Sequence, residues 1–165
     1  MAVRVQEHDF DVGAEIGRLR EGRTDIGAVV TFTGAMRGED GEDQGLTDMT
    51  LEHYPGMTEA ELERIEAEAH HRWPLQASLI IHRYGLLRPG DNIVLVVTAS
   101  RHRQAAFESA EFLMDFLKTR APFWKKETRN DGSGGWVDAR EADDSALDRW
   151  QAGADAPMAR PKAAQ

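Results

Sequence analysis

The chain has 165 residues, of which 41% are hydrophobic and 30% charged, and its formal net charge is −9. This length predicts one domain with a modest hydrophobic core, and this composition excludes a disordered or fibrous protein. The negative charge argues against broad adhesion to nucleic acid or to an anionic membrane surface, because both are themselves negative. An anionic ligand would therefore need a local cationic pocket.

The sequence contains no cysteine, which excludes disulfides, thiolate metal sites, iron–sulfur clusters and a thiol nucleophile. The first residues, MAVRVQEHDFDVG, do not form a signal-peptide pattern, so we expect a cytoplasmic protein. The longest strongly apolar run, Ile93–Val97, is far shorter than the roughly 20 residues that a membrane span needs. The sequence therefore predicts no membrane-spanning segment.

The first half of the chain predicts strands, a helix and a loop before a second helix. In chain order the patterns indicate a strand over Val3–Val5, a helix through Phe10, Val12, Ile16 and Leu19 to Arg20, a buried strand over Ile26–Thr33, a mobile acidic loop over Arg37–Gly45 and a strand over Thr47–His53. Thr58 and Glu61 match a capping box, which predicts that the next helix begins there. It continues to about Arg72, and Pro74 ends it.

The second half predicts a hairpin, a long helix and a second hairpin. Strands over Ala77–Tyr84 and Asn92–Ser100 are joined by Leu87–Asp91, whose Pro-Gly-Asp sequence is typical of a turn. An amphipathic helix is predicted over Arg103–Lys118 from the helical spacing of Ala106, Ala110, Leu113 and Leu117, with Phe107 and Met114 alongside. Further strands are predicted over Phe123–Thr128 and Gly135–Val137, followed by a helix over Asp143–Trp150.

These elements predict one α+β domain over residues 1–150, in which helices cover one side of a sheet. Residues 151–165 are rich in alanine and proline without an apolar face, and we expect a disordered tail there. Neither a G-x-x-x-x-G-K-[ST] sequence nor a G-x-G-x-x-G sequence after a strand is present, so motifs of nucleotide enzymes lend no support.

A cluster of positive charge stands out between Arg101 and Arg129, where seven cations and four acids give a local charge of +3. Arg101, His102 and Arg103 lie where a predicted strand passes into the long helix, and helix N-termini attract anions. We therefore expect this segment to form one basic pocket that could bind a phosphate or a carboxylate. A set of solvated surface charges is the alternative interpretation.

Two lysines of this segment lie beside apolar groups. Lys118 borders the apolar stripe of the long helix, and Lys125 follows the aromatic pair Phe123 and Trp124. A sheltered lysine can serve as an acid, a base or a nucleophile. A surface lysine whose stem covers apolar groups is the alternative.

The six histidines show no metal-ligand spacing such as H-E-x-x-H, so we expect no metal site. His82 alternates with apolar residues in its predicted strand, and we expect it to be structural. The acids of the loop, Glu39, Asp40, Glu42 and Asp43, are expected to be solvated.

Six segments carry a more specific pattern: VTFTGAMR (30–37), LEHYPGMTE (51–59), RWPL (72–75), HRYGLLRPGD (82–91), HRQAAFE (102–108) and MDFLKTRAPFWKKE (114–127). Together, and in this order, they resemble the MoaE family, the large catalytic subunits of molybdopterin synthase. The resemblance extends from about residue 3 to residue 150, and the predicted tail lies outside it.

The resemblance implies an α/β hammerhead fold with an additional small β subdomain, and a sulfurtransferase of molybdenum cofactor biosynthesis. The family converts cyclic pyranopterin monophosphate (precursor Z) into molybdopterin by installing two sulfurs. The sulfur donor is the C-terminal Gly-Gly thiocarboxylate of a small ubiquitin-like subunit, and two large subunits form a homodimer within a heterotetramer. Neither a cofactor nor a metal is implied.

The resemblance also implies site residues. Lys118 in FLKTRAP and Lys125 in PFWKKE match the family's catalytic lysines. Substrate-binding roles are implied for Ala35, Met36, Arg37, His102, Arg103, Lys126, Glu127 and Arg140, the last of which would help to hold the phosphate. A non-catalytic dimeric module that captures an acidic C-terminal tail is the alternative function, and turnover would separate the two.

Overall fold

The computed structural model describes residues 1–38, 45–137 and 148–150, which contain three helices and eight strands besides a helical turn at 148–150. In chain order the elements are β1 (Val3–Gln6), α1 (Val12–Arg20), β2 (Ala28–Ala35), β3 (Leu46–His53), α2 (Met57–Arg72), β4 (Leu75–Arg83), β5 (Gly85–Leu87), β6 (Asn92–Ser100), α3 (Arg103–Thr119), β7 (Phe123–Arg129) and β8 (Gly134–Val137). No helix in the described ranges has both the length and the apolar composition of a bilayer span. The predicted tail, most of the acidic loop and most of the last predicted helix lie outside these ranges.

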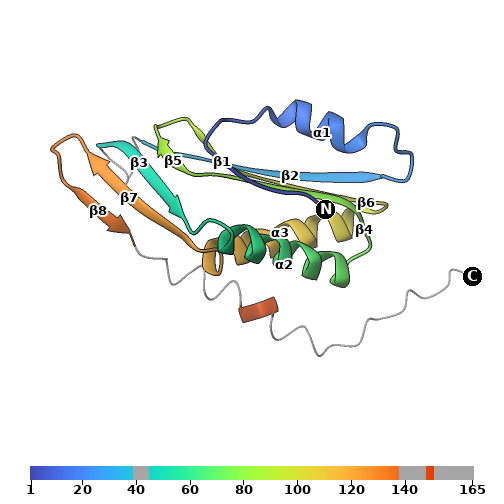
Figure 1. Ribbon diagram of the computed structural model, residues 1–165. Helices are drawn as coiled ribbons and strands as arrows, with labels where there is room; N and C mark the ends of the chain where they lie inside the picture. The colour runs from blue at the N-terminus through green and yellow to red at the C-terminus, as the bar shows by residue number, and fades with distance from the viewer. Residues whose placement is uncertain (39–44, 138–147, 151–165) are drawn as a thin grey trace, which may run out of the picture.

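The larger sheet has the strand order β1-β4-β6-β2 (Figure 1). Its centre is the antiparallel pair β4 and β6, in which Leu79 lies opposite Val97, so the predicted hairpin is confirmed. Strand β1 pairs with β4 in the parallel sense. Both central strands are buried along most of their length because both of their faces are covered.

Helices cover both faces of this sheet, and not one face as the element pattern predicted. Helices α2 and α3 lie on one face and α1 lies on the other (Figure 1). Ile80 and Val96 pack with α2 and α3, whereas their neighbours Ile81 and Val97 pack with α1. Alternate residues of a strand point to opposite faces, so two apolar faces need two covers.

Strand β2 is an edge strand, although its β-branched residues predicted a buried one. Among the described strands it pairs only with β6, and Phe32 is 39% exposed. Gly27, just before it, packs against the chain where β6 ends. A Cβ there would lie 2.3 Å from the Arg101 carbonyl oxygen, so the close approach requires glycine.

The second sheet has the order β5-β3-β7-β8. Strand β5 lies between β4 and β6 in sequence, where the pattern predicted only a connection, and it pairs with β3 through Leu87 and Met49. Both side chains are buried in a core that this sheet forms beside the larger one. The predicted hairpin of β7 and β8 is confirmed. The structure therefore confirms the α+β class with an additional β subdomain.

Helix α2 begins differently from the predicted capping box. Its first residue is Met57, and the Glu59 side chain accepts a hydrogen bond from the Gly56 N–H at 2.7 Å. Thr58 is fully buried; its hydroxyl accepts from the Tyr54 N–H at 3.0 Å and donates to the Pro122 carbonyl at 3.1 Å. The threonine thus ties α2 to the segment before β7, and its predicted capping role is wrong.

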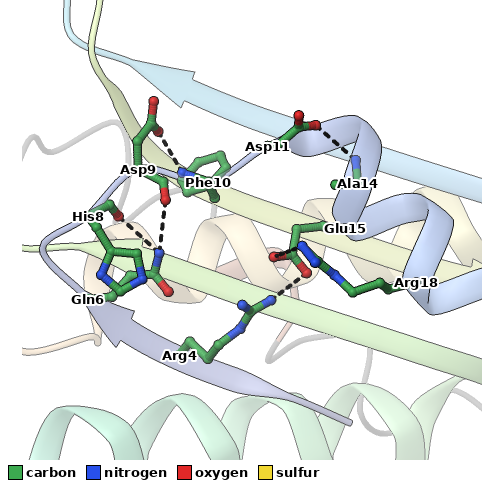
Figure 2. A network of polar contacts seen from close by, with 9 residues as sticks. All are labelled: Arg4, Gln6, His8, Asp9, Phe10, Asp11, Ala14, Glu15 and Arg18. Carbon is green, nitrogen blue, oxygen red and sulfur yellow. Dashed lines mark hydrogen bonds and ion pairs between the residues drawn. The ribbon is translucent and has the colours of Figure 1, made fainter.

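A buried carboxylate joins β1 to α1, as Figure 2 shows. Glu15 is 6% exposed. Its carboxylate accepts hydrogen bonds from the guanidinium groups of Arg4, at 2.5 Å between nitrogen and oxygen, and of Arg18, at 3.0 Å. The hydrogen bond from Arg4 lowers the pKa of Glu15 below its ordinary value, against the opposing effect of burial. Asp11 caps the helix by accepting from the Ala14 N–H at 2.9 Å.

Candidate active site

A cavity of about 400 Å³ lies where the C-terminal end of α3 meets the two sheets. This volume is in the range of small-molecule binding sites. Most of the lining is apolar, and it comes from six strands and helices and the turn after α3. The lining residues are Phe32, Gly34, Ala35, Met49, Leu51, His82, Ile93, Val94, Met114, Leu117, Lys118, Ala121, Phe123 and Lys125.

Lys118 and Lys125 both line this cavity. Lys118 is exposed near the end of α3, and Lys125 lies on β7 with 34% of its side chain exposed. The chain reverses between them: α3 ends at Thr119, and Pro122 precedes the start of β7. Proline cannot continue a helix, so the turn is local, and it brings the two lysines to one cavity.

Lys125 is paired with a carboxylate of its own strand. Its Nζ lies 2.8 Å from Glu127 Oε1, and Arg129 lies 3.9 Å from the other carboxylate oxygen. Residues two apart on a strand share a face, so the pair lies along the inner face of β7. Glu127 is only 12% exposed in its side chain and is a fixed counter-charge for the lysine.

Lys126 lies on the other face of β7. It is exposed, with Thr50 of β3 and Trp136 of β8 opposite it in the sheet. Trp136 is 57% exposed and Trp124, on the same face, 48%. The structure therefore separates Lys126 from the cavity that holds Lys125.

Ala35, Met36 and Arg37, at the end of β2 and just after it, lie in three different environments. Ala35 lines the cavity. Met36 is 5% exposed and packs in the core of the second sheet, where its N–H donates to the Asp91 carbonyl at 2.9 Å. Arg37 is exposed. Of these three predicted substrate residues, one lines the cavity.

His102 and Arg103 lie at the opposite end of α3 from Lys118. His102 is the N-cap residue and Arg103 the first residue of the helix, and both are exposed. Lys118 follows Arg103 by 15 residues, which corresponds to about 22 Å along a helix axis. The expectation of one basic pocket spanning Arg101–Arg129 is therefore wrong within a single chain. Arg140 lies outside the described residues.

His82 lines the cavity together with the two lysines. Its Nδ1 lies 2.9 Å from the Arg83 carbonyl oxygen, and its ring stacks on Phe123 with 3.7 Å between centroids. Burial lowers the pKa of His82 to about 4. The sequence suggested a purely structural histidine; the alternation in β4 could have placed it on the face of Ile80, but not in a cavity.

Phe32 and Met114 also line the cavity, although the sequence did not predict either as a site residue. Both belong to apolar patterns that are equally typical of core residues, so the sequence carries no signal that separates the two roles. Within the described ranges, no three His, Asp or Glu side chains gather in a group that could hold a metal ion.

A family model described as MoaE protein matches residues 5–120 of the chain. A molybdopterin synthase catalytic subunit from Mesorhizobium japonicum is 63% identical over 150 residues, which cover 90% of this chain and 92% of that protein. The solved structure of a molybdopterin biosynthesis MoaE protein from Burkholderia ambifaria is 53% identical with a TM-score of 0.78, covering 92% of this chain and 99% of its own. A molybdopterin synthase structure from Staphylococcus aureus is 28% identical with a TM-score of 0.74, covering 82% of this chain and 96% of its own.

Proposed function

The chain belongs to the MoaE family of molybdopterin synthase catalytic subunits, and from this premise we propose that it is a sulfurtransferase of molybdenum cofactor biosynthesis. It converts cyclic pyranopterin monophosphate into molybdopterin with two sulfurs from the thiocarboxylated C-terminus of a small ubiquitin-like subunit. One observation carries the proposal: Lys118 and Lys125, from different elements, line the same cavity.

The lysines fit a reaction in which carbon–oxygen bonds are replaced by carbon–sulfur bonds. An ammonium group can stabilise a negative oxygen that develops as the sulfur attacks, and it can give that oxygen a proton as it leaves. Lys125 is held by Glu127, whereas Lys118 makes no ion pair within the described residues and is exposed at the helix end. We assign Lys118 to the donor's terminal carboxyl group and both lysines to proton transfer.

The mostly apolar lining limits the number of waters around the donor's thiocarboxylate. The transfer still uses one water, which cleaves the acyl carbon–sulfur bond after the sulfur has bonded to the pterin and leaves a carboxylate on the small subunit. Phe32, Leu117 and Phe123 contribute to this lining. Exclusion of water also strengthens the effect of the lysine charges. Because the chain has no cysteine, the sulfur must arrive already activated on a partner. We place this reaction in the cytoplasm.

The distance along α3 supports a homodimer within a heterotetramer. A substrate in the cavity beside Lys118 is out of reach of Arg103 of the same chain, about 22 Å away along the helix. If Arg103 and His102 bind the substrate phosphate, they do so in the cavity of a second copy. Arg37 and Arg140 are assigned to the same phosphate, and Ala35 and Glu127 to the surroundings of the substrate. Met36 and Lys126 lie outside the cavity, so the substrate contacts implied for them are not assigned to a substrate bound there.

Turnover tests the proposal. The full chain is incubated with cyclic pyranopterin monophosphate and thiocarboxylated small subunit, and molybdopterin is measured. Wild-type protein should form product, and Lys118→Ala should lower its rate by about 100-fold or more, the effect of losing an acid–base group. Arg64→Ala removes a cation from the exposed side of α2 and is the control.

Two results would refute the assignment. Wild-type rates in Lys118→Ala would exclude the lysine from the chemistry. Binding of the small subunit without any molybdopterin from wild-type protein would favour the non-catalytic module that captures an acidic tail.

A further inference from the structure

The two ring nitrogens of His82 have different environments. Nδ1 lies 2.9 Å from the Arg83 carbonyl oxygen, and a carbonyl can only accept a hydrogen bond. Nδ1 therefore carries the proton, and Nε2 carries a lone pair in the neutral ring. Within the described part of the chain Nε2 has no hydrogen-bond partner, and the ring lines the cavity of Lys118 and Lys125.

The ring stays neutral at physiological pH. Burial and the neighbouring His53 lower its pKa to about 4. The ring is also fixed in place, because Phe123 stacks on it with an interplanar angle of 18°. A neutral, fixed histidine presents its lone pair in one direction.

The other polar side chains of the cavity cannot accept a hydrogen bond. Lysine ammonium groups only donate, and the remaining described lining residues have apolar side chains or none. A ligand that enters this cavity with an N–H or O–H group loses its hydrogen bonds to water. That loss is costly unless an acceptor replaces the water.

We propose that His82 Nε2 is this acceptor and binds an N–H or O–H group of the ligand seated between the two lysines. The inference rests on the proposed function for the identity of that ligand. Two sources have the required chemistry: the ring N–H groups of the pterin substrate, and the backbone N–H groups of the glycine tail of the small subunit.

Binding measurements with two variants distinguish the sources. Cyclic pyranopterin monophosphate and the thiocarboxylated small subunit are titrated separately into wild-type protein, His82→Phe and His82→Gln. Phenylalanine keeps a ring on Phe123 but removes the acceptor, and glutamine restores an acceptor oxygen. We expect His82→Phe to weaken one of the ligands by about 5- to 20-fold, and His82→Gln to recover most of the loss.

The ligand whose binding is weakened is the one that donates a hydrogen bond to His82. If both ligands bind His82→Phe as tightly as wild-type protein, the proposal is wrong. If binding falls in His82→Phe and glutamine does not restore it, the ring acts only through packing, which also overturns the proposal.

A second measurement needs no variant, in case His82→Phe does not fold. In ¹⁵N-histidine-labelled wild-type protein, the His82 resonances should show a protonated Nδ1 and an unprotonated Nε2, and one ligand should shift the Nε2 resonance. A protonated Nε2 in the free protein, or no shift with either ligand, contradicts the proposal. Product formation is scored separately: a shifted resonance without molybdopterin refutes the proposed function alone, and molybdopterin with an unshifted resonance refutes the role of His82 alone.

Discussion

Lys125 Nζ lies 2.8 Å from Glu127 Oε1, two residues along the same face of β7. The lysine side chain is 34% exposed and lines the cavity, whereas the glutamate side chain is 12% exposed and lies deeper. A charge-assisted hydrogen bond to a mostly buried group restricts the rotamers of the exposed partner. Glu127 therefore acts on the cavity by positioning Lys125.

Replacing this carboxylate should reduce catalysis more than binding. Glu127→Gln keeps the size of the side chain but removes the charge, and we expect kcat to fall about 3- to 10-fold with little change in KM. Steady-state rates of molybdopterin formation measure both constants. Glu52→Gln, on the exposed face of the same sheet, is the control and should behave as wild type. An unchanged kcat in Glu127→Gln would show that Lys125 needs no partner.

Mixing Arg103→Ala with Lys118→Ala tests whether the site is shared between copies. Arg103→Ala should mainly weaken substrate binding, and Lys118→Ala should abolish turnover. Because the two residues are about 22 Å apart along α3, a mixed dimer would contain one site with both groups intact. Co-purified mixed dimers should therefore recover about half of the wild-type activity. No recovery above the single variants would place both residues in one site of one chain.

A methyl group added at Gly34 should narrow the cavity. The new Cβ would lie 2.8 Å from Val94 Cγ1, so the neighbouring side chain must move. We expect Gly34→Ala to lower the free energy of unfolding by about 1–3 kcal/mol and to raise KM for the pterin. Gly17→Ala is the matched control: its Cβ meets nothing within 4 Å on α1, and it should stabilise the protein by about 0.5–1 kcal/mol.

The stabilisation from Glu15 should depend on pH. Its pKa is lowered in the folded protein from the ordinary value of 4.5, chiefly by the hydrogen bond from Arg4. Its contribution is therefore complete above pH 4.5 and is lost as the pH falls through the lowered pKa. Near neutral pH we expect Glu15→Gln to lower the free energy of unfolding by about 1–2 kcal/mol. The loss is no larger because solvent screens the charges of the two partly exposed arginines.

Urea unfolding of wild-type protein and Glu15→Gln at several pH values measures this difference. The gap between the two curves should close in acid. Glu63→Gln, which removes an exposed carboxylate from α2, should leave the wild-type stability unchanged at every pH. A gap that is the same in acid and at neutral pH would mean that Glu15 stabilises the fold without its charge.

The buried hydroxyl of Thr58 should stabilise the fold by linking α2 to the segment before β7, and not by capping the helix. Thr58→Ala leaves the Tyr54 N–H and the Pro122 carbonyl without a partner, and we expect a loss of about 1–3 kcal/mol. Thr58→Ser keeps the hydroxyl and should lose less. Thermal or chemical unfolding measures both. A small effect in Thr58→Ala, together with a large one in Glu61→Gln, would restore the predicted capping box.

Local patterns were enough to predict most elements of this fold. Helix α3, the β4–β6 hairpin and the β7–β8 hairpin follow from periodicity and turn residues, because those signals act between residues close in the chain. The pairing of Lys118 and Lys125 at one place also has a local cause, the reversal at Pro122. The resemblance to the MoaE family, carried by six short segments, is confirmed by the family model.

The sequence could not predict which side of a strand faces the cavity or which helix covers which face of the sheet. The alternation of side chains along a strand predicts that Lys125 and Lys126 point to opposite sides of β7. Only packing against the larger sheet decides which of these sides faces the cavity. The same holds for His82, which a strand pattern cannot distinguish from a core residue, and for α1, which covers the second face of the sheet. The sequence by itself determined a small acidic α+β domain without a thiol and with a cationic segment. The separation of Arg103 from Lys118 follows already from the predicted helix, because a stiff helix keeps residues fifteen positions apart from sharing one pocket. Only the tertiary structure decided which end of α3 carries the cavity, because strands from both sheets pack around that end.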